Sequence, residues 1–549
     1  MQKLVIGIIL FLLCTLKLGD RGFGEQGRAP QGELRIVDTR EVFGFSVAQN
    51  VVEHLVEIDT EGTLVPRLAT GWRWLDDRTL EMSLRQGVTF HNGEVFDAAI
   101  VKHNWDEYLR LQQHWGADLV WWTFPPESSL TISDPYTIQL VLPAPDAAAL
   151  VKLGYMPMTN RQFSRAVALA GGPGSYWPTL FSAGPWGTGP YQWVHGSTPV
   201  GTRSDRVTLE ANLAYWDPTR FPRLQRVVFD NTLARHDAAE LVKTGEGRVD
   251  LFADLRPLDT LRVAQSPFAK VVKERGGLRN VLGLLNMRTA GSPWRDVRLR
   301  QAVNYAINRE DLIRYAAKGN GVLIPALLPP RAFGYDPALA PHAFAPATAQ
   351  HLLRDAGYGH GLSITLIATA SLDVQATVVS KMLEQVGLTV QRQLLDDAAF
   401  QKAVNLYWVP AHVRDQPTMV LSERHAWDIA LMTTELETSL AISFPTPVYR
   451  MYALNGEYDW VLEQVELRQL YEQVTRTSDR AQQQALIQQM ERHTRDQAYF
   501  LFLYNLIQLY AVNKAVEFVP HPSGLLSLAE TAVTDQHWSV RKRKADMQE

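Results

Sequence analysis

The chain has 549 residues, of which 46% are hydrophobic and 20% charged, a composition typical of a folded globular protein rather than a disordered or coiled-coil one. Its formal net charge of −4 gives no basic excess, which argues against a nucleic-acid partner. A chain of this length is expected to form several packing units rather than one.

The N-terminus has the pattern of a secretory signal. Lys3 precedes an apolar run over residues 4–16, and Lys17 follows it. The run is shorter than the ~20 residues that span a bilayer as a helix, and a basic start with a short apolar run is typical of a signal peptide. We expect residues 1–29 to be a signal peptide, with a retained membrane anchor as the alternative. The only cysteine, Cys14, lies inside this run; it is either lost on cleavage or a lipid attachment point, and a disulfide framework is excluded.

The segment Thr79 to Leu109 predicts a strand, a turn and a helix. Apolar and polar residues alternate over Leu80–Leu84, as in a strand with one buried face. Asn92-Gly93 favours a tight turn, and Asp97 is placed to cap the helix that follows. Farther along, apolar residues recur with helical spacing over Leu299–Ile307, which predicts a buried helix face.

Residues 362–432 predict a β-α-β unit and therefore an α/β fold. Strand-like runs occupy 362–368, 388–395 and 427–432, and a helix between the first two starts at Asp373 and ends before Gly387. Strands joined through a helix become parallel neighbours with a right-handed crossover. The helix would be capped by Asp373 and carry Val374, Val378, Met382 and Val386.

Open parallel sheets bind ligands beyond the carboxyl ends of their strands. The third predicted strand is followed by Thr433-Thr434-Glu435-Leu436-Glu437. Glu435 and Glu437 are therefore candidate binding residues on geometric grounds alone.

Motifs that would mark a catalytic or metal site were sought without success. The chain contains no Gly-rich phosphate loop followed by Lys-Ser or Lys-Thr, no Gly-x-Ser-x-Gly turn and no His-Glu-x-x-His. Its 14 histidines are scattered, and a single cysteine cannot supply paired thiolate ligands. We therefore expect a protein that is not an enzyme and has no cofactor or metal.

Five ordered blocks resemble the extracytoplasmic solute-binding proteins of family 5, which serve ABC importers of peptides and nickel. They include the strings "LRQGVTFHNG", "GTGPY", "NLAYWDP", "RQAVNYAINRE" and "HLLRDAGY". The blocks lie at residues 64–109, 187–191, 211–229, 282–313 and 347–358. Any one block is weak alone, but their order along the chain makes the resemblance specific.

The resemblance implies a two-lobe, hinge-linked periplasmic-binding-protein fold of type II around a cleft. The N-terminal lobe would span residues 30–278 and contain a small extra subdomain at about 60–185. The C-terminal lobe would span 279–500, and 501–549 would return to the N-terminal lobe and form a tail.

The resemblance also implies binding residues. In the peptide-binding branch an aspartate, preceded by a tryptophan, pairs with the α-amino group of the peptide. Here that aspartate is replaced by Glu437 and the tryptophan by Thr434. The carboxylate is retained, so Glu437 remains a candidate partner for an ammonium group. The other candidates are Glu435, Arg424 for a solute carboxylate, and Trp186, Tyr407 and Trp408 as aromatic lining residues, with core packing or a solvated surface as the alternative for each.

The implied function is capture of an oligopeptide or peptide-like solute by hinge closure and its delivery to a membrane permease. The expected partners are this solute and an ABC permease and ATPase complex, and the protein would be a periplasmic monomer, free or anchored through its N-terminus. A binder of nickel chelate, haem or a sugar-like solute is one alternative, and a sensor or chaperone that feeds no importer is another.

Overall fold

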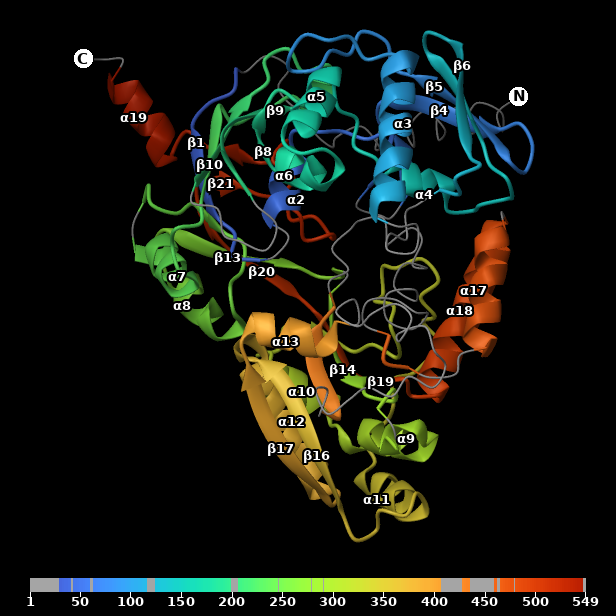
Figure 1. The fold of residues 1–549 in the computed structure, drawn as a ribbon. Coiled ribbons are helices and arrows are strands. Elements are labelled where there is room, and N and C mark those ends of the chain that lie inside the picture. Colours follow the sequence, from blue (N-terminus) through green and yellow to red (C-terminus); the bar gives the residue numbers. More distant parts are fainter. Residues whose placement is uncertain are drawn as a thin grey trace, which may run out of the picture.

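The computed structural model describes residues 29–40, 43–59, 63–115, 124–198, 206–244, 246–277, 279–289, 291–405, 427–434, 459–461, 465–477 and 479–546. Two large mixed sheets and one smaller antiparallel sheet organise these residues (Figure 1). We call the eight-stranded and four-stranded sheets with their helices the N-terminal lobe, and the six-stranded sheet with its helices the C-terminal lobe.

The eight-stranded sheet has the order β13 (Ala269–Glu274), β20 (Gln508–Asn513), β12 (Leu251–Phe252), β1 (Glu33–Val37), β11 (Arg226–Asp230), β10 (Arg206–Ala211), β9 (Tyr191–Ser197) and β8 (Ser182–Gly184). The six-stranded sheet has the order β15 (Gly321–Val322), β19 (Phe500–Leu506), β14 (Asn280–Leu285), β18 (Ile429–Thr433), β16 (Leu362–Thr369) and β17 (Leu388–Leu395). The four-stranded sheet has the order β4 (Ala69–Trp74), β5 (Thr79–Leu84), β7 (Thr137–Val141) and β6 (Ser129–Asp134). Two further pairs join β2 (Val56–Ile58) to β3 (Leu64–Pro66) and β21 (Val516–Glu517) to β22 (Ala532–Val533).

Helices of the N-terminal lobe are α2 (Phe43–Ala48), α3 (Ala98–Trp115), α4 (Ala149–Leu153), α5 (Arg161–Leu169), α6 (Tyr176–Leu180), α7 (Arg235–Thr244), α8 (Thr260–Ala264) and α19 (Trp538–Asp546). The remaining helices are α9 (Val297–Ala306), α10 (Arg309–Tyr315), α11 (Pro346–Asp355), α12 (Asp373–Gln385), α13 (Asp397–Val404), α17 (Val465–Arg476) and α18 (Arg480–Asp496). Among the described residues, none of the helices is both long and apolar enough to span a bilayer.

The predicted strand, turn and helix after Thr79 are confirmed. The inward residues of β5, which are Leu80, Met82 and Leu84, are buried. Gly93 adopts a φ of 85° in the turn that follows. The Asp97 carboxylate accepts a hydrogen bond from the Ile100 amide at 2.9 Å and so caps α3. Strand β5 and helix α3 share a hydrophobic core of their own, centred on Trp105. The strand, turn and helix after Thr79 therefore have a structural role, because together they build a wall of the N-terminal lobe.

The predicted β-α-β unit is confirmed, since β16 pairs in parallel with both β17 and β18. The apolar residues predicted for α12 are not all buried: Val378 and Met382 are partly buried against the core and Val386, just after the helix, is buried. Val374 is 41% exposed, and Ala376, Val379 and Leu383 are buried in the core. Asp373 is the first residue of the helix rather than its cap, and its carboxylate forms an ion pair with Arg392 at 2.7 Å.

Within the described ranges, the chain passes between the two lobes at two crossings. The first runs from the end of β13 at Glu274 to the start of β14 at Asn280. The second consists of Ile507 alone, between β19 and β20. The boundary expected at residue 500 coincides with the first residue of β19, which still belongs to the six-stranded sheet. The chain re-enters the N-terminal lobe at Gln508.

Candidate functional site

The strand register brings the carboxyl ends of β1 and β12 in one large sheet, and of β18 in the other, to the two crossings. In the N-terminal lobe β12 runs antiparallel to β20, and the Leu255 amide beyond β12 donates to the Leu509 carbonyl at 3.2 Å, next to the second crossing. Strand β1 is parallel to β12 and ends on the same side. In the C-terminal lobe β18 runs antiparallel to β14, which places Thr433 opposite Val281, next to the first crossing. Ligands of open α/β sheets bind at such strand ends, so this junction is the candidate site.

The first polar residues beyond β1 are paired with each other. Arg40 donates to both carboxylate oxygens of Asp38 at 2.7 and 2.6 Å, and its third nitrogen donates to the Gly524 carbonyl at 2.6 Å. Both side chains are buried. A bidentate pair with this geometry orders the strand end against the returning C-terminal segment. It leaves little donor capacity for a solute.

A second polar group at this junction was missed by sequence reasoning. The Asp254 carboxylate, just beyond β12, accepts a hydrogen bond from the Thr39 hydroxyl at 2.6 Å and forms an ion pair with Arg235 at the start of α7. The Arg235 side chain is 37% exposed. A guanidinium has five N–H donors, so this arginine can pair with Asp254 and still contact a solute carboxylate. The only signal in the sequence is that Thr39 and Asp254 follow strands directly.

In the C-terminal lobe, Thr434 fixes the start of the segment that carries the predicted glutamates. Its amide donates to the Asn280 carbonyl at 2.7 Å, and its hydroxyl accepts from the Asn280 amide at 2.8 Å. The Asn280 side chain donates to the Leu327 carbonyl at 2.6 Å and accepts from the Asn505 side chain at 3.0 Å. Thr434 is thus a buried anchor beside the hinge.

Most of the candidate binding residues lie outside the described residues. They are Glu435, Glu437, Arg424, Tyr407 and Trp408. Their roles remain predictions, and the structure adds only that residues 435 and 437 follow an anchored strand end at the junction.

Trp186 is the one candidate binding residue that the structure describes. It is 9% exposed, its ring lies 5.7 Å from that of Phe163, and its indole nitrogen donates to the Ser182 carbonyl at 3.2 Å. These are the contacts of a core residue between α5 and β8. Its role in solute binding remains a prediction.

Three of the sequence blocks meet at a joint between the small sheet and the eight-stranded sheet. Arg67 forms ion pairs with Glu53 at 2.9 Å, Asp217 at 2.9 Å and Glu57 at 3.2 Å. Glu53 also accepts hydrogen bonds at 2.8 Å from three side chains, those of Thr188, Tyr215 and Trp216. Burial, with the nearby Glu53 carboxylate, raises the pKa of Tyr215 well above its usual value, so this hydroxyl is a permanent donor. The blocks "LVPRLA", "GTGPY" and "NLAYWDP" therefore contribute side chains to this structural joint.

The glycines of "GTGPY" are required by close packing at the same joint. A Cβ on Gly187 would lie 1.9 Å from the Val51 carbonyl oxygen, and one on Gly189 would lie 2.7 Å from that of Asn50. Backbone atoms cannot yield as a flexible side chain can, so any larger residue would push the two segments apart.

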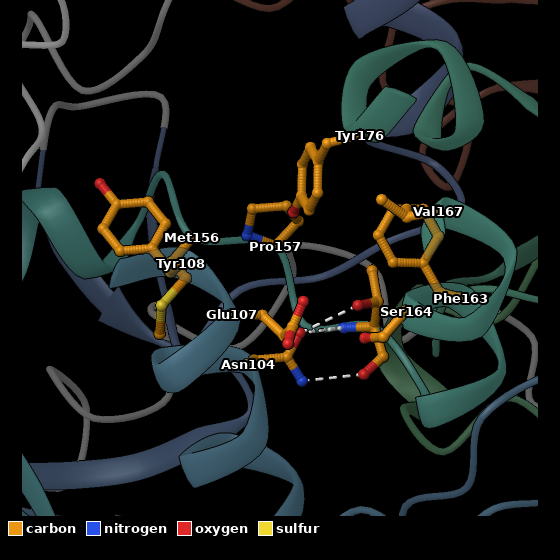
Figure 2. Close-up of a pocket in the computed structure, with 10 residues that line it drawn as sticks. Asn104, Glu107, Tyr108, Met156, Pro157, Phe163, Ser164, Val167 and Tyr176 are labelled. Carbon is orange, nitrogen blue, oxygen red and sulfur yellow. Dashed lines mark hydrogen bonds between the residues drawn. The ribbon is translucent and has the colours of Figure 1, made fainter. Parts of the chain in front are cut away.

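Two cavities in the described residues lie away from the junction. Figure 2 shows a pocket between α3, α5 and α6, whose volume of about 10 Å³ suits at most a single water molecule. A larger polar groove of about 560 Å³ lies on the outer surface beside α19, at the amino end of β1 and so at the opposite end of that strand from the junction. In the part of the chain that the structure describes, no group of three or more His, Cys, Asp or Glu side chains is placed to hold a metal ion.

Comparison with known sequences identifies the family. Residues 63–432 match the profile of the bacterial extracellular solute-binding proteins, family 5. The chain belongs to this family. Its members are extracytoplasmic solute-binding proteins rather than enzymes, and the family predicted from the five blocks is confirmed.

Curated relatives include two proteins named glutathione-binding protein GsiB. The one from Escherichia coli strain K12 is 25% identical over 363 residues, and the one from Salmonella paratyphi A is 26% identical over 364 residues. Each alignment covers 65% of this chain and 66% of the relative. The chain therefore matches slightly less than two thirds of the length of these relatives.

Solved structures confirm the predicted two-lobe periplasmic-binding-protein fold. DppA from Helicobacter pylori in complex with the peptide STSA has a TM-score of 0.71 at 17% identity, over 91% of this chain and 98% of that one. CtaP from Listeria monocytogenes has a TM-score of 0.75 at 18% identity, over 92% and 100%. NikA from Brucella suis in complex with Fe(III)-EDTA has a TM-score of 0.73 at 21% identity, over 91% and 100%.

Proposed function

We propose that this chain is the substrate-binding component of an ABC importer that captures an oligopeptide or peptide-like solute. The observation that carries the proposal is the register of the two large sheets, which brings the strand ends of both lobes to two short crossings. A solute at that junction touches both lobes only when they close, so binding shifts the population toward the closed form. The closed form then docks on a membrane permease with its ATPase.

The solute contacts follow from charge. Glu437 pairs with the ammonium group of the solute, with Glu435 as the second carboxylate near it, while Arg424 or Arg235 meets its carboxylate. Trp186, Tyr407 and Trp408 supply aromatic surface. Micromolar to nanomolar affinity requires about 8 to 12 kcal/mol of binding free energy, which a few charge-assisted hydrogen bonds and buried apolar area can provide.

The family and its relatives support a peptide-like solute. DppA of Helicobacter pylori is described with the peptide STSA, AppA of Bacillus subtilis with a nonapeptide, and the curated relatives are named for glutathione. The alternative, a metal chelate, is favoured by the similarity to NikA, described from Staphylococcus aureus with Ni(L-His)2. In our proposal the protein acts as a periplasmic monomer, with the N-terminal segment as its signal or anchor.

A thermal-shift screen of purified protein tests this function. The panel contains synthetic di- to nonapeptides, glutathione, Ni(L-His)2 and Fe(III)-EDTA. A ligand at 100 times its dissociation constant stabilises the folded state by about 2.7 kcal/mol, so a peptide that binds raises the melting temperature in a concentration-dependent manner. A response to the chelates alone would favour the alternative, and a flat response across the peptides would contradict the proposal.

A further inference from the structure

Two consecutive residues at the end of β13 contact the opposite lobe. The Lys273 ammonium group donates to the Asn320 side-chain oxygen at 2.7 Å. The Glu274 carboxylate accepts from the Arg331 guanidinium at 3.5 Å. Asn320 directly precedes β15 of the six-stranded sheet, and Arg331 lies against Gly276 in the first crossing. These contacts therefore span the hinge itself.

The Glu274–Arg331 pair is unevenly buried. The Glu274 side chain is 10% exposed and that of Arg331 is 42% exposed. The Asp38–Arg40 pair in the same region differs: its members are 0% and 3% exposed and its contacts are 2.6–2.7 Å long. Burial removes most of the water from the Glu274 carboxylate. The contact to Arg331 is long and Arg331 itself is partly hydrated, so this contact offsets the loss of hydration of an ionised carboxylate poorly. Burial accordingly raises the pKa of Glu274, although Arg331 opposes the change.

Among the described residues, Glu274 and Arg331 interact with two further titratable groups, Tyr510 and His521. Tyr510 on β20 is the group that feels the Glu274 charge, and it also faces Arg40 and Asp38. Gln508, opposite Glu274 in the sheet, donates to the Ala253 carbonyl at 2.8 Å.

His521 is a second titratable group that interacts electrostatically with Arg331. Burial lowers the pKa of His521, and its charged neighbours are Glu57, Arg220, Asp59 and Arg331. Its protonation would act in the opposite sense to that of Glu274, because a buried histidine binds its proton less tightly than a solvated one.

We propose that Glu274 is a proton-dependent element of the hinge, whose uncharged form favours the lobe arrangement described here and whose ionised form favours separation of the lobes. The inference rests on the proposed hinge motion. The arrangement that buries the carboxyl group binds its proton more tightly than an arrangement in which the group is hydrated, so acidification shifts the population toward the buried form. Each unit of pKa difference between the two arrangements changes their ratio about tenfold.

Spin labels on the two lobes measure this ratio. Cys14 is the only native cysteine, so the full chain with Cys14→Ser can be labelled at Asp237→Cys on α7 and Glu384→Cys on α12, both exposed positions. Between about pH 7.5 and pH 5, double electron–electron resonance is expected to show a rise in the ratio of the present inter-lobe distance to the longer one, by up to about tenfold for each unit of pKa difference between the two arrangements.

Substitutions test whether Glu274 is the group responsible for the pH response of the inter-lobe distance. Glu274→Gln is expected to hold the present distance at both pH values. Arg331→Gln removes the attraction that supports the charge and is expected to move the response to higher pH. Glu517→Gln is the matched control: its partner Arg223 lies 2.8 Å away within the N-terminal lobe, and both side chains are about half exposed. Its response is expected to equal that of the parent.

A pH response that persists unchanged in Glu274→Gln would overturn the inference. If that response also disappears in His521→Gln, the pH dependence belongs to His521 instead. Failure of the proposed function is distinguishable, because a mixture of di- to nonapeptides is added at fixed pH as a separate arm. If the inter-lobe distance changes when peptide is added but not when the pH is changed, the proposed role of Glu274 is refuted and the hinge motion is not. A distance that never changes contradicts the hinge motion itself.

Discussion

Replacement of Arg67 with methionine is expected to destabilise the joint between the small sheet and the eight-stranded sheet. The Arg67 side chain is 9% exposed, and those of its partners Glu53 and Asp217 are 4% and 12% exposed. Methionine preserves most of the volume but removes the guanidinium that forms ion pairs with both of these buried carboxylates. Removal of one member of a buried ion pair costs about 3–5 kcal/mol, because the remaining charge stays desolvated.

The loss of unfolding free energy caused by Arg67→Met should lie toward the lower end of that range. Glu53 keeps its hydrogen bonds from Thr188, Tyr215 and Trp216, and these donors stabilise part of its charge. We therefore expect the unfolding free energy to fall by about 3 kcal/mol, a value near that for loss of a buried charge partner.

Chemical unfolding followed by tryptophan fluorescence measures this loss. Arg73→Met is the matched control in the same small sheet: Arg73 lies 2.6 Å from Glu81, but its side chain is 72% exposed. An exposed pair contributes about 0–1 kcal/mol, so the control should unfold almost as the parent does. If Arg67→Met cost no more than Arg73→Met, the joint would not depend on its buried charges and the structural role given to the three sequence blocks would be refuted.

Three further predictions address packing, pH and binding. Gly187→Ala should destabilise the protein strongly, since its Cβ would lie 1.9 Å from the Val51 carbonyl oxygen; a melting temperature equal to that of the parent would contradict the close packing. Burial lowers the pKa of His91 to about 4, against a partial offset by the Gly189 carbonyl. Unfolding free energy should therefore fall as pH drops from about 6.5 toward 4, because the unfolded state binds the proton first. His91→Gln should flatten that slope in chemical unfolding at several pH values, and an unchanged slope would assign the effect elsewhere. Glu437→Gln should weaken binding of an amine-bearing peptide by about 1.5–3 kcal/mol in calorimetry, and unchanged affinity would refute the ammonium contact.

Local structure could be predicted from the sequence where the signal was itself local. The alternation over Leu80–Leu84, the cap at Asp97 and the parallel strands on either side of α12 each depend on spacing within a few residues.

The buried face of α12 could not be predicted in this way. Apolar residues occur on more than one side of this helix, so periodicity alone permits both Val374 and Val379 as inward positions. The choice is made by the strands and helices on which the helix packs, β16, β17 and α9. In the structure Val379 is buried and Val374 is 41% exposed.

The residue at which the chain makes its second crossing could not be predicted from local sequence either. Strands β19 and β20 form an almost continuous buried run from Phe500 to Asn513, with only Ile507 between them. No glycine, proline or polar cluster marks the point at which the chain leaves one sheet for the other. The Arg235–Asp254–Thr39 group at the junction was missed for a related reason, since only the order of strands in the sheet brings these distant segments together.

Native mass spectrometry of the purified protein with a defined mixture of di- to nonapeptides tests the central claim most directly. We expect one peptide bound per chain, and the peptide released on denaturation should have its original mass. Peptides released as fragments, or no complex with any peptide in the mixture, would contradict the claim that this protein captures a peptide-like solute and leaves it intact.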